Sequence, residues 1–291
     1  MGASFRQDFL TTPDGARIYY QVQGEGSVAL AFCDGLGCDG FAWKYLLPIL
    51  GERYTLLRWH YRGHGRSPVP SQRELIGMHH TCEDLARVMD AANIPSAVVF
   101  GHSMGVQVAL EFHRRFGSRV RGLALLCGSY GNPLDTWHDH TMLRAVFPRL
   151  RDLVERFPSQ SKRVTSVLMK LETTLELAVR TELNPDLIQR EDMVPYFDHL
   201  AAMEPVAFVR TLDSLKDHSA WEHLPYVQVP TLIVGGERDR FTPVWLSRRM
   251  AEAITGSELL LVPGGSHTAP LERPGLINRA VSAFLRRHFA P

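Results

Sequence analysis

Short continuous runs of apolar residues recur along the chain, separated by polar loops and by segments whose apolar residues follow helical spacing. The runs cover residues 28–33, 54–57, 97–100, 120–127, 229–234 and 258–262. Each has the length and uninterrupted apolar character of a strand that is buried on both faces. Between the second and third runs, Leu85, Val88 and Met89 lie at helical spacing after Thr81-x-x-Asp84, a pattern typical of a helix start. This alternation predicts an α/β fold with a mostly parallel central sheet of about eight strands, flanked by helices.

Two parts of the chain depart from this alternation. Residues 5–23 alternate polar and apolar positions around Pro13-Asp14-Gly15, which predicts a hairpin at the edge of the sheet. Residues 131–221 contain no strand-like run but carry two apolar stripes at helical spacing. The stripes are Leu143, Val146, Leu150, Leu153, Val154 and Phe157, then Val164, Val167, Leu168, Leu171, Leu175 and Ala178. We therefore predict a core of residues 1–130 and 222–291, with residues 131–221 inserted as a helical cap.

The apolar stripes of the cap have two interpretations. They form a surface for a partner, or they pack on the protein's own body, as a stripe of this width normally does. We favour the second interpretation. It predicts that the main pocket lies between cap and core and is mostly apolar.

Composition excludes several classes of protein. Of the 291 residues, 45% are hydrophobic and 22% charged, which is typical of a folded globular chain. The 32 basic and 31 acidic residues give a net charge of +1, so we expect no nucleic acid as partner. The four cysteines show no C-x-x-C spacing and are interpreted as reduced thiols of a cytoplasmic protein. We see no export signal and expect no membrane span.

A candidate nucleophile lies in Gly101-His102-Ser103-Met104-Gly105, which comes directly after one buried run and directly before a helical segment. A serine on a sharp turn from strand to helix has a strained backbone, and the two glycines remove β-carbons that would clash across the turn. Ser103 could instead serve only as a helix N-cap, but that role needs neither glycine. The pattern therefore favours a nucleophile.

A serine hydroxyl needs a base and an acid that orients the base. Asp239 follows the strand-like run 229–234, and His267 follows the run 258–262. Because parallel strands bring their carboxyl ends to one edge, both residues are expected near Ser103. Alone, Asp239 has an alternative role as a turn residue. We predict that Asp239, and neither Asp213 nor Asp217, bonds the imidazole of His267.

Taken together, these motifs resemble the α/β-hydrolase superfamily, in the capped branch of esterases, lactonases, C–C bond hydrolases and cofactor-free haloperoxidases. The resemblance covers about residues 5–289. It rests on the serine pattern, on Arg62-Gly63-His64-Gly65-Arg66-Ser67, on Gly236-x-x-Asp239-x-x-x-Pro243, and on His267 followed by Glu272-x-Pro274. The resemblance implies an α/β-hydrolase fold with a cap and a catalytic triad of Ser103, Asp239 and His267. It also implies an oxyanion hole formed by the backbone amides of Leu36 and Met104.

The chain departs from the family pattern at two positions. The loop after the first buried run begins Asp34-Gly35 where the family usually has His-Gly, and the arginine motif begins with His60 where the family usually has Asp. An ionised Asp34 would oppose negative charge in the oxyanion hole. We predict that the exchanged residues support the site as a hydrogen-bonded pair of ionised Asp34 and protonated His60. The alternative is two independent, solvated substitutions.

The predicted activity is hydrolysis of an ester-like bond in a small, partly hydrophobic acyl substrate through an acyl-serine intermediate. The same triad is compatible with a C–C bond hydrolase, a lactonase or an acyltransferase, and the fold is sometimes used as a small-molecule receptor. No cofactor is expected. No metal is expected either, since the histidine pairs 79–80 and 138–140 lack further ligands at a suitable spacing.

Overall fold

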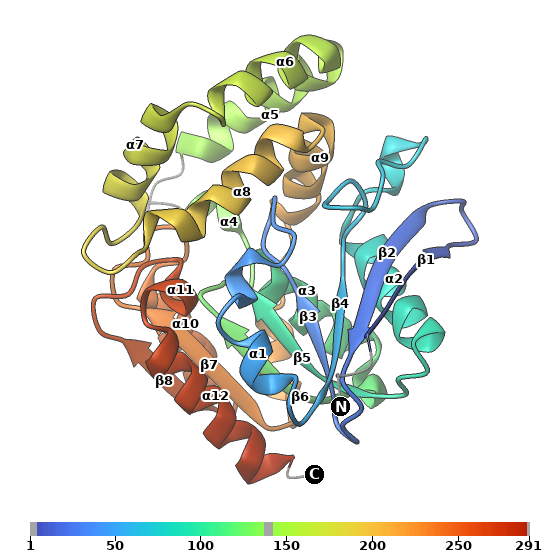
Figure 1. Cartoon of the computed structure of the whole chain (residues 1–291), viewed down its shortest axis with the longest axis vertical. Helices are drawn as coiled ribbons and strands as arrows, with labels where there is room; N and C mark the ends of the chain where they lie inside the picture. Colours follow the sequence, from blue (N-terminus) through green and yellow to red (C-terminus); the bar gives the residue numbers. More distant parts are fainter. Residues whose placement is uncertain (1–4, 137–141, 290–291) are drawn as a thin grey trace.

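Eight strands form one sheet in the order β1-β2-β4-β3-β5-β6-β7-β8 (Figure 1). The structure is a computed structural model that describes residues 5–136 and 142–289. The strands are β1 Phe5–Thr11, β2 Arg17–Gln23, β3 Ala29–Cys33, β4 Thr55–Trp59, β5 Ala97–His102, β6 Val120–Leu126, β7 Thr231–Gly236 and β8 Glu258–Val262. The principal helices of the core are α1 Leu47–Leu50, α2 Met78–Ala91, α3 Met104–Arg115, α10 Val244–Ala253, α11 Ala269–Glu272 and α12 Pro274–His288.

The predicted parallel sheet and its antiparallel edge hairpin are both present. Strand β1 pairs with β2, and β2 with β4, in antiparallel register, whereas the ladders from β4 through β3, β5, β6 and β7 to β8 are parallel. Every residue of β3, β5 and β7 is buried, which explains why these strands are continuous apolar runs in the sequence.

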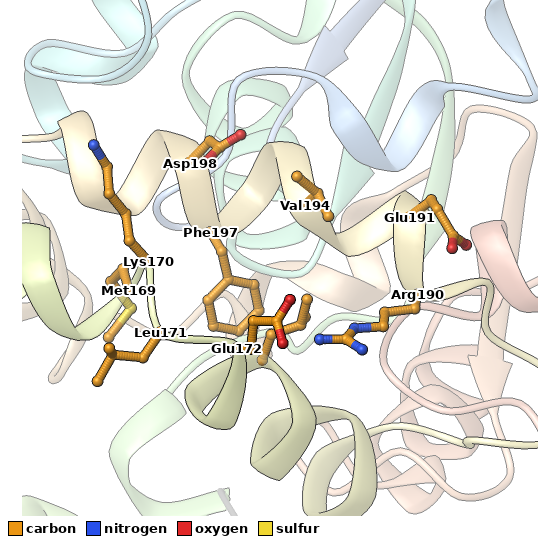
Figure 2. A pocket seen from close by; sticks show the side chains of 10 residues that line it. Met169, Lys170, Leu171, Glu172, Arg190, Glu191, Val194, Phe197 and Asp198 are labelled. Atoms are coloured by element: carbon orange, nitrogen blue, oxygen red, sulfur yellow. The ribbon is translucent and has the colours of Figure 1, made fainter.

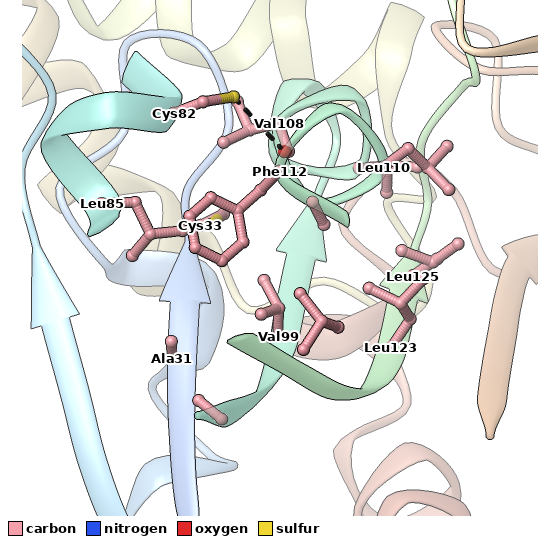
Figure 3. Close-up of a cluster of buried hydrophobic side chains, with 14 of the residues drawn as sticks. Ala31, Cys33, Cys82, Leu85, Val99, Val108, Leu110, Phe112, Leu123 and Leu125 are labelled. Carbon is pink, nitrogen blue, oxygen red and sulfur yellow. Dashed lines mark hydrogen bonds between the residues drawn. The ribbon is translucent and has the colours of Figure 1, made fainter. Parts of the chain in front are cut away.

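Successive residues of the central strands point into two core layers on opposite faces of the sheet. Ala31 and Val99 pack with helices α2, α3 and α10 on one face (Figure 3). Leu30 and Val98 pack with α1 and α12 on the other. This alternation follows from the two-residue period of a strand. The sheet is thus held rigidly by helices on both faces, and its loops are free to form a site.

The predicted start of helix α2 is wrong. The helix begins at Met78, so Thr81 lies inside it, where its hydroxyl donates to the carbonyl oxygen of Gly77. Asp84 also has another role. Its carboxylate accepts two hydrogen bonds from the buried guanidinium of Arg62, at 2.7 and 2.8 Å. A buried charged pair takes precedence here over local capping, because an unpaired buried arginine is strongly unfavourable.

Between β6 and β7 the chain forms helices, as predicted. They are α4 Pro133–Thr136, α5 Met142–Arg156, α6 Pro158–Leu168, α7 Glu172–Glu182, α8 Arg190–Ala202 and α9 Pro205–Leu215. We call this segment, residues 131–221, the helical insertion. Gly131 and Ser219 form an antiparallel bridge, so the insertion leaves and rejoins the core at neighbouring points.

Helices α8 and α9 of the insertion lie on the loops that follow β3 and β4. A β-carbon added to Gly37, after β3, would lie 2.7 Å from Cδ2 of Leu200. One added to Gly63, after β4, would lie 2.4 Å from Cβ of Ala207. The insertion therefore covers the carboxyl edge of this part of the sheet (Figure 1).

The apolar stripes were expected to pack on the body of the protein, but most of their side chains are exposed, so this prediction is wrong for them. Val154 and Leu175 are buried. The exposed members are Val146, Leu150, Leu153, Phe157, Val164, Val167, Leu168 and Leu171. No residue of helix α6 is buried. Among the described helices, none is long and apolar enough to cross a membrane.

Candidate active site

Ser103 sits between the last residue of β5 and the first of α3, with backbone angles φ 56° and ψ −120°. A non-glycine residue with positive φ is strained, and such strain persists only where surrounding packing enforces it. A β-carbon on Gly101 would lie 2.4 Å from the carbonyl oxygen of Gly105, and one on Gly105 would lie 2.0 Å from that of Cys33. The turn is therefore compatible only with glycine at both positions, as the sequence pattern predicts.

Hydrogen bonds connect Ser103, His267 and Asp239. Nε2 of His267 lies 2.8 Å from Oγ of Ser103, and Nδ1 lies 2.9 Å from Oδ2 of Asp239. Because a carboxylate only accepts, Nδ1 carries the proton and donates to Asp239. The lone pair of Nε2 then faces the hydroxyl of Ser103, which is the arrangement that a general base requires.

The predicted choice of acid agrees with these contacts. The two rejected carboxylates have other partners: Asp213 pairs with Arg151 and Asp217 with Arg144.

Asp239 is buried and held by the turn that it begins. Its Oδ1 accepts the backbone N–H of Phe241 at 2.9 Å and that of Thr242 at 2.8 Å. The hydroxyl of Thr242 donates to Oδ2 at 2.8 Å. Three donors and the imidazole thus fix both carboxylate oxygens. Asp239 therefore has both roles that the sequence suggests: it holds a turn, and it contacts His267.

Two further residues hold the loop of His267. The carboxylate of Glu272 accepts the backbone N–H of Ser266 at 2.6 Å and that of Asn184, in the insertion, at 3.1 Å. Nε2–H of His102 donates to the carbonyl oxygen of His267 at 3.0 Å, and burial lowers the pKa of His102 to about 4, so its ring is neutral. Both residues belong to sequence motifs, but neither contact can be predicted from spacing along the chain.

Met104 and the loop that carries Leu36 both lie close to Ser103. Met104 is the first residue of α3, so its N–H lies outside the hydrogen-bond ladder of the helix. Leu36 follows Gly35, at which an added β-carbon would lie 3.1 Å from Cβ of Ser103. The loop after β3 can approach the serine this closely because Gly35 has no side chain.

The predicted pair of Asp34 and His60 is wrong. Oδ1 of Asp34 accepts Nε1–H of Trp43 at 2.5 Å. Nδ1 of His60 instead accepts the backbone N–H of Arg66 at 2.8 Å. Strands β3 and β4 are neighbours, as expected. The two side chains nevertheless turn toward their own loops, because each finds a closer partner there.

The pKa shifts of the two residues also run opposite to those that such a pair would produce. Burial raises the pKa of Asp34 to about 7, although Arg58 and Trp43 partly oppose the shift. Burial lowers the pKa of His60 to about 3, so this ring is neutral. An ionised Asp34 would oppose negative charge in the candidate oxyanion hole. Because burial keeps the carboxyl mostly protonated below pH 7, this opposition is weakened without a histidine partner.

Two cavities lie on the insertion itself, away from Ser103. One cavity of about 440 Å³ lies on the insertion, between α7 and α8, with Leu175, Phe197 and Arg190 among its lining residues (Figure 2). A second of about 410 Å³ adjoins it and shares Glu172 and Arg190. Both are lined by charged as well as apolar side chains.

No group of three potential metal ligands occurs among residues 5–136 and 142–289. His79 contacts Glu83 on the surface of α2, and His138 and His140 lie outside the described residues.

Comparison with known proteins agrees with the fold. Mouse serine hydrolase BPHL is 25% identical over 283 residues, with 94% of this chain and 84% of the relative aligned. The enol-lactonase of Burkholderia xenovorans LB400 superposes with a TM-score of 0.75 at 19% identity, covering 96% of this chain and 99% of the other. The esterase of Exiguobacterium antarcticum gives 0.76 at 20% identity, covering 98% of this chain and 100% of its own. The family model described as the alpha/beta hydrolase family matches residues 32–280. The chain therefore belongs to the alpha/beta hydrolase family.

Proposed function

We propose that the chain is a serine hydrolase that cleaves an ester-like bond of a small, partly hydrophobic substrate. Ser103 is the nucleophile, His267 the base and Asp239 the residue that orients the base. The observation that carries the proposal is the continuous set of hydrogen bonds from Ser103 Oγ through His267 to Asp239, at 2.8 and 2.9 Å, on a strained turn between strand and helix.

In the proposed reaction, Oγ of Ser103 attacks the substrate carbonyl carbon while Nε2 of His267 takes the hydroxyl proton. His267 gives that proton to the departing alcohol, which leaves an acyl-serine. Water then attacks the acyl group, its proton passes to His267 and then to Ser103, and the carboxylic acid is released. The steps use only these side chains and water, so the proposal includes no metal or cofactor.

The backbone N–H groups of Leu36 and Met104 stabilise the negative oxygen that forms in each attack. The close approach of the Gly35 loop to Ser103 supports this assignment. The mostly protonated state of Asp34 below pH 7 supports it too, since a neutral carboxyl does not oppose the developing charge.

We further propose that the helical insertion acts as a cap that controls access to Ser103, and that the protein is cytoplasmic. The close contacts of Leu200 and Ala207 with the loops after β3 and β4 support the first point. The four unpaired, buried cysteines support the second.

The nucleophile is tested by labelling with a fluorophosphonate probe and by turnover of p-nitrophenyl esters of short and long chain length. We expect the wild type to be labelled at Ser103, and Ser103→Ala to lose labelling and about 10³-fold or more of kcat. Ser159→Ala, at an exposed position of α6, is the matched control and should retain both. Labelling of another residue in Ser103→Ala would refute the proposal. Esters, thioesters, lactones and vinylogous diketones then separate the reaction types, and binding without turnover of any of them would indicate a receptor.

A further inference from the structure

Helix α6 is oriented with its polar side toward the protein. Nζ of Lys162 donates to the backbone carbonyl oxygens of Ala202 and Met203 at the end of α8, and Oγ of Ser166 donates to that of Ala201 at 2.8 Å. Carbonyl oxygens at a helix end lack partners within the helix, so these bonds satisfy them. The contacts also fix the rotation of α6 about its axis. The opposite, apolar side of the helix is therefore held toward solvent.

The consecutive helices α5 and α6 each carry exposed apolar side chains, which together we call the hairpin face. Val164, Val167 and Leu168 of α6 are 56%, 57% and 44% exposed. On α5, Leu150 and Leu153 are 46% and 55% exposed. Helices α5 and α6 form the outermost layer of the insertion, at the end of the molecule farthest from the C-terminus (Figure 1). Isolated exposed apolar residues are ordinary, but a set of this size on two adjacent helices indicates a contact surface.

Positive charges lie beside this apolar set. Arg149 and Arg156 of α5 are three residues from Val146 and Leu153, and Arg163 of α6 is four residues from Val167, so each neighbours the face on its helix. Lys170 follows in the turn two residues beyond the end of α6. All four are exposed. Among the described residues, no carboxylate forms an ion pair with any of these four.

The two acidic residues of α5 already have basic partners. Asp152 pairs with Arg151 at 2.8 Å, and Glu155 pairs with Arg210 at 3.0 Å. The face therefore combines exposed apolar side chains with an excess of unpaired cations.

We propose that the hairpin face docks on an anionic lipid surface. An amphipathic helix with apolar side chains beside Lys and Arg lies in the plane of the membrane interface, where its apolar side enters the acyl boundary and its cations meet lipid phosphates. A second copy of this chain fits less well, because it would bring a further set of unpaired cations against this one. The proposal concerns attachment only and is independent of the chemistry assigned to Ser103.

The test is flotation of the full chain with liposomes of phosphatidylcholine alone and of phosphatidylcholine with 30% phosphatidylglycerol. We expect binding to the anionic liposomes that weakens as salt is raised. Leu153→Gln with Val167→Gln, and separately Arg149→Gln with Arg163→Gln, should each weaken binding about tenfold or more. These side chains are exposed, so folding should be retained, and circular dichroism and the melting temperature check it.

Matched controls lie on the core. Ile49→Gln replaces an apolar residue of α1 that is 43% exposed, and Arg248→Gln replaces an exposed arginine of α10. Both should bind liposomes as the wild type does. The proposal is overturned if no liposome is bound, or if the hairpin variants bind unchanged. It is also overturned if sedimentation shows a dimer that Leu153→Gln with Val167→Gln dissociates, because a second copy then covers the face.

Discussion

At the scale of single residues, Asp34 illustrates how burial changes the charge of a group beside the candidate active site. The residue is 6% exposed, and its Oδ1 accepts the indole N–H of Trp43. Its pKa is raised to about 7, whereas an unfolded aspartate titrates near pH 4. The folded state therefore binds a proton that the unfolded state has released throughout the interval between these two values.

This difference predicts a specific pH dependence of stability. The stabilisation from the Asp34 proton is complete below about pH 4 and is lost as pH rises to about 7, at about 1.4 kcal/mol per pH unit. Asp34→Asn keeps an oxygen that accepts from Trp43 but removes the titration. Urea unfolding from pH 4 to 7 should thus show the free energy of unfolding of the variant rising relative to that of the wild type.

Asp8→Asn, at an exposed position of β1, is the control for Asp34→Asn. Parallel pH profiles of Asp34→Asn and wild type would contradict a raised pKa at Asp34.

At the scale of elements, the packing of α3 on β3 depends on a missing side chain. Gly105 lies in the first turn of α3, and a β-carbon there would meet the carbonyl oxygens of Cys33 and Asp34 at 2.0 and 2.9 Å. Neither oxygen belongs to a flexible side chain, so the helix itself must move away from the strand to admit a methyl group.

We therefore predict that Gly105→Ala destabilises the fold by about 2–3 kcal/mol or more, because overpacking forces backbone shifts. The same shift moves Ser103 away from His267, so ester turnover should also fall. Gly117→Ala is the matched control, since a β-carbon there has no atom within 4 Å. Chemical denaturation and kinetics on purified variants measure both effects. Equal stability of the two variants would show that α3 does not pack as closely on β3 as described.

The sequence predicted the sheet well because strands buried on both faces leave continuous apolar runs. Strand β3, for example, is buried throughout and matches the run 28–33 to within one residue. Helical periodicity does not predict the packing of α6. An apolar stripe shows that a helix has an apolar side, but it does not show what that side contacts. The sequence also predicts that the strands before Asp34 and His60 are neighbours. It does not predict that Asp34 bonds Trp43 and His60 bonds Arg66, because these contacts depend on side-chain directions in the folded loops.

At the scale of the whole molecule, buried neutral histidines oppose stability in acid. Burial lowers the pKa of His64 and of His102 to about 4 and that of His60 to about 3. An unfolded histidine titrates near pH 6.5, so here the unfolded state binds more protons than the folded state. The stabilisation is complete above pH 6.5 and is lost as pH falls toward 4.

We expect the free energy of unfolding to fall between pH 6.5 and 4, with each of these histidines contributing up to about 1.4 kcal/mol per pH unit. His64→Gln should make this fall shallower even if it lowers stability at pH 7, because only the slope reports the titration. His79→Gln, at a surface position of α2, is the matched control. An unchanged slope in His64→Gln would contradict the buried neutral state of His64.

The neighbouring ends of the helical insertion have a consequence for exchanging parts between relatives. Gly131 and Ser219 are bridged, so a replacement segment whose ends are equally close could join the sheet without rearranging it. The graft must also supply a backbone donor in the place of Asn184, because that N–H and Ser266 share the carboxylate of Glu272. Chimaeras that keep both the bridge and this donor should accept the new insertion as a unit. Those that lack the donor should fold, but their His267 loop should be more mobile.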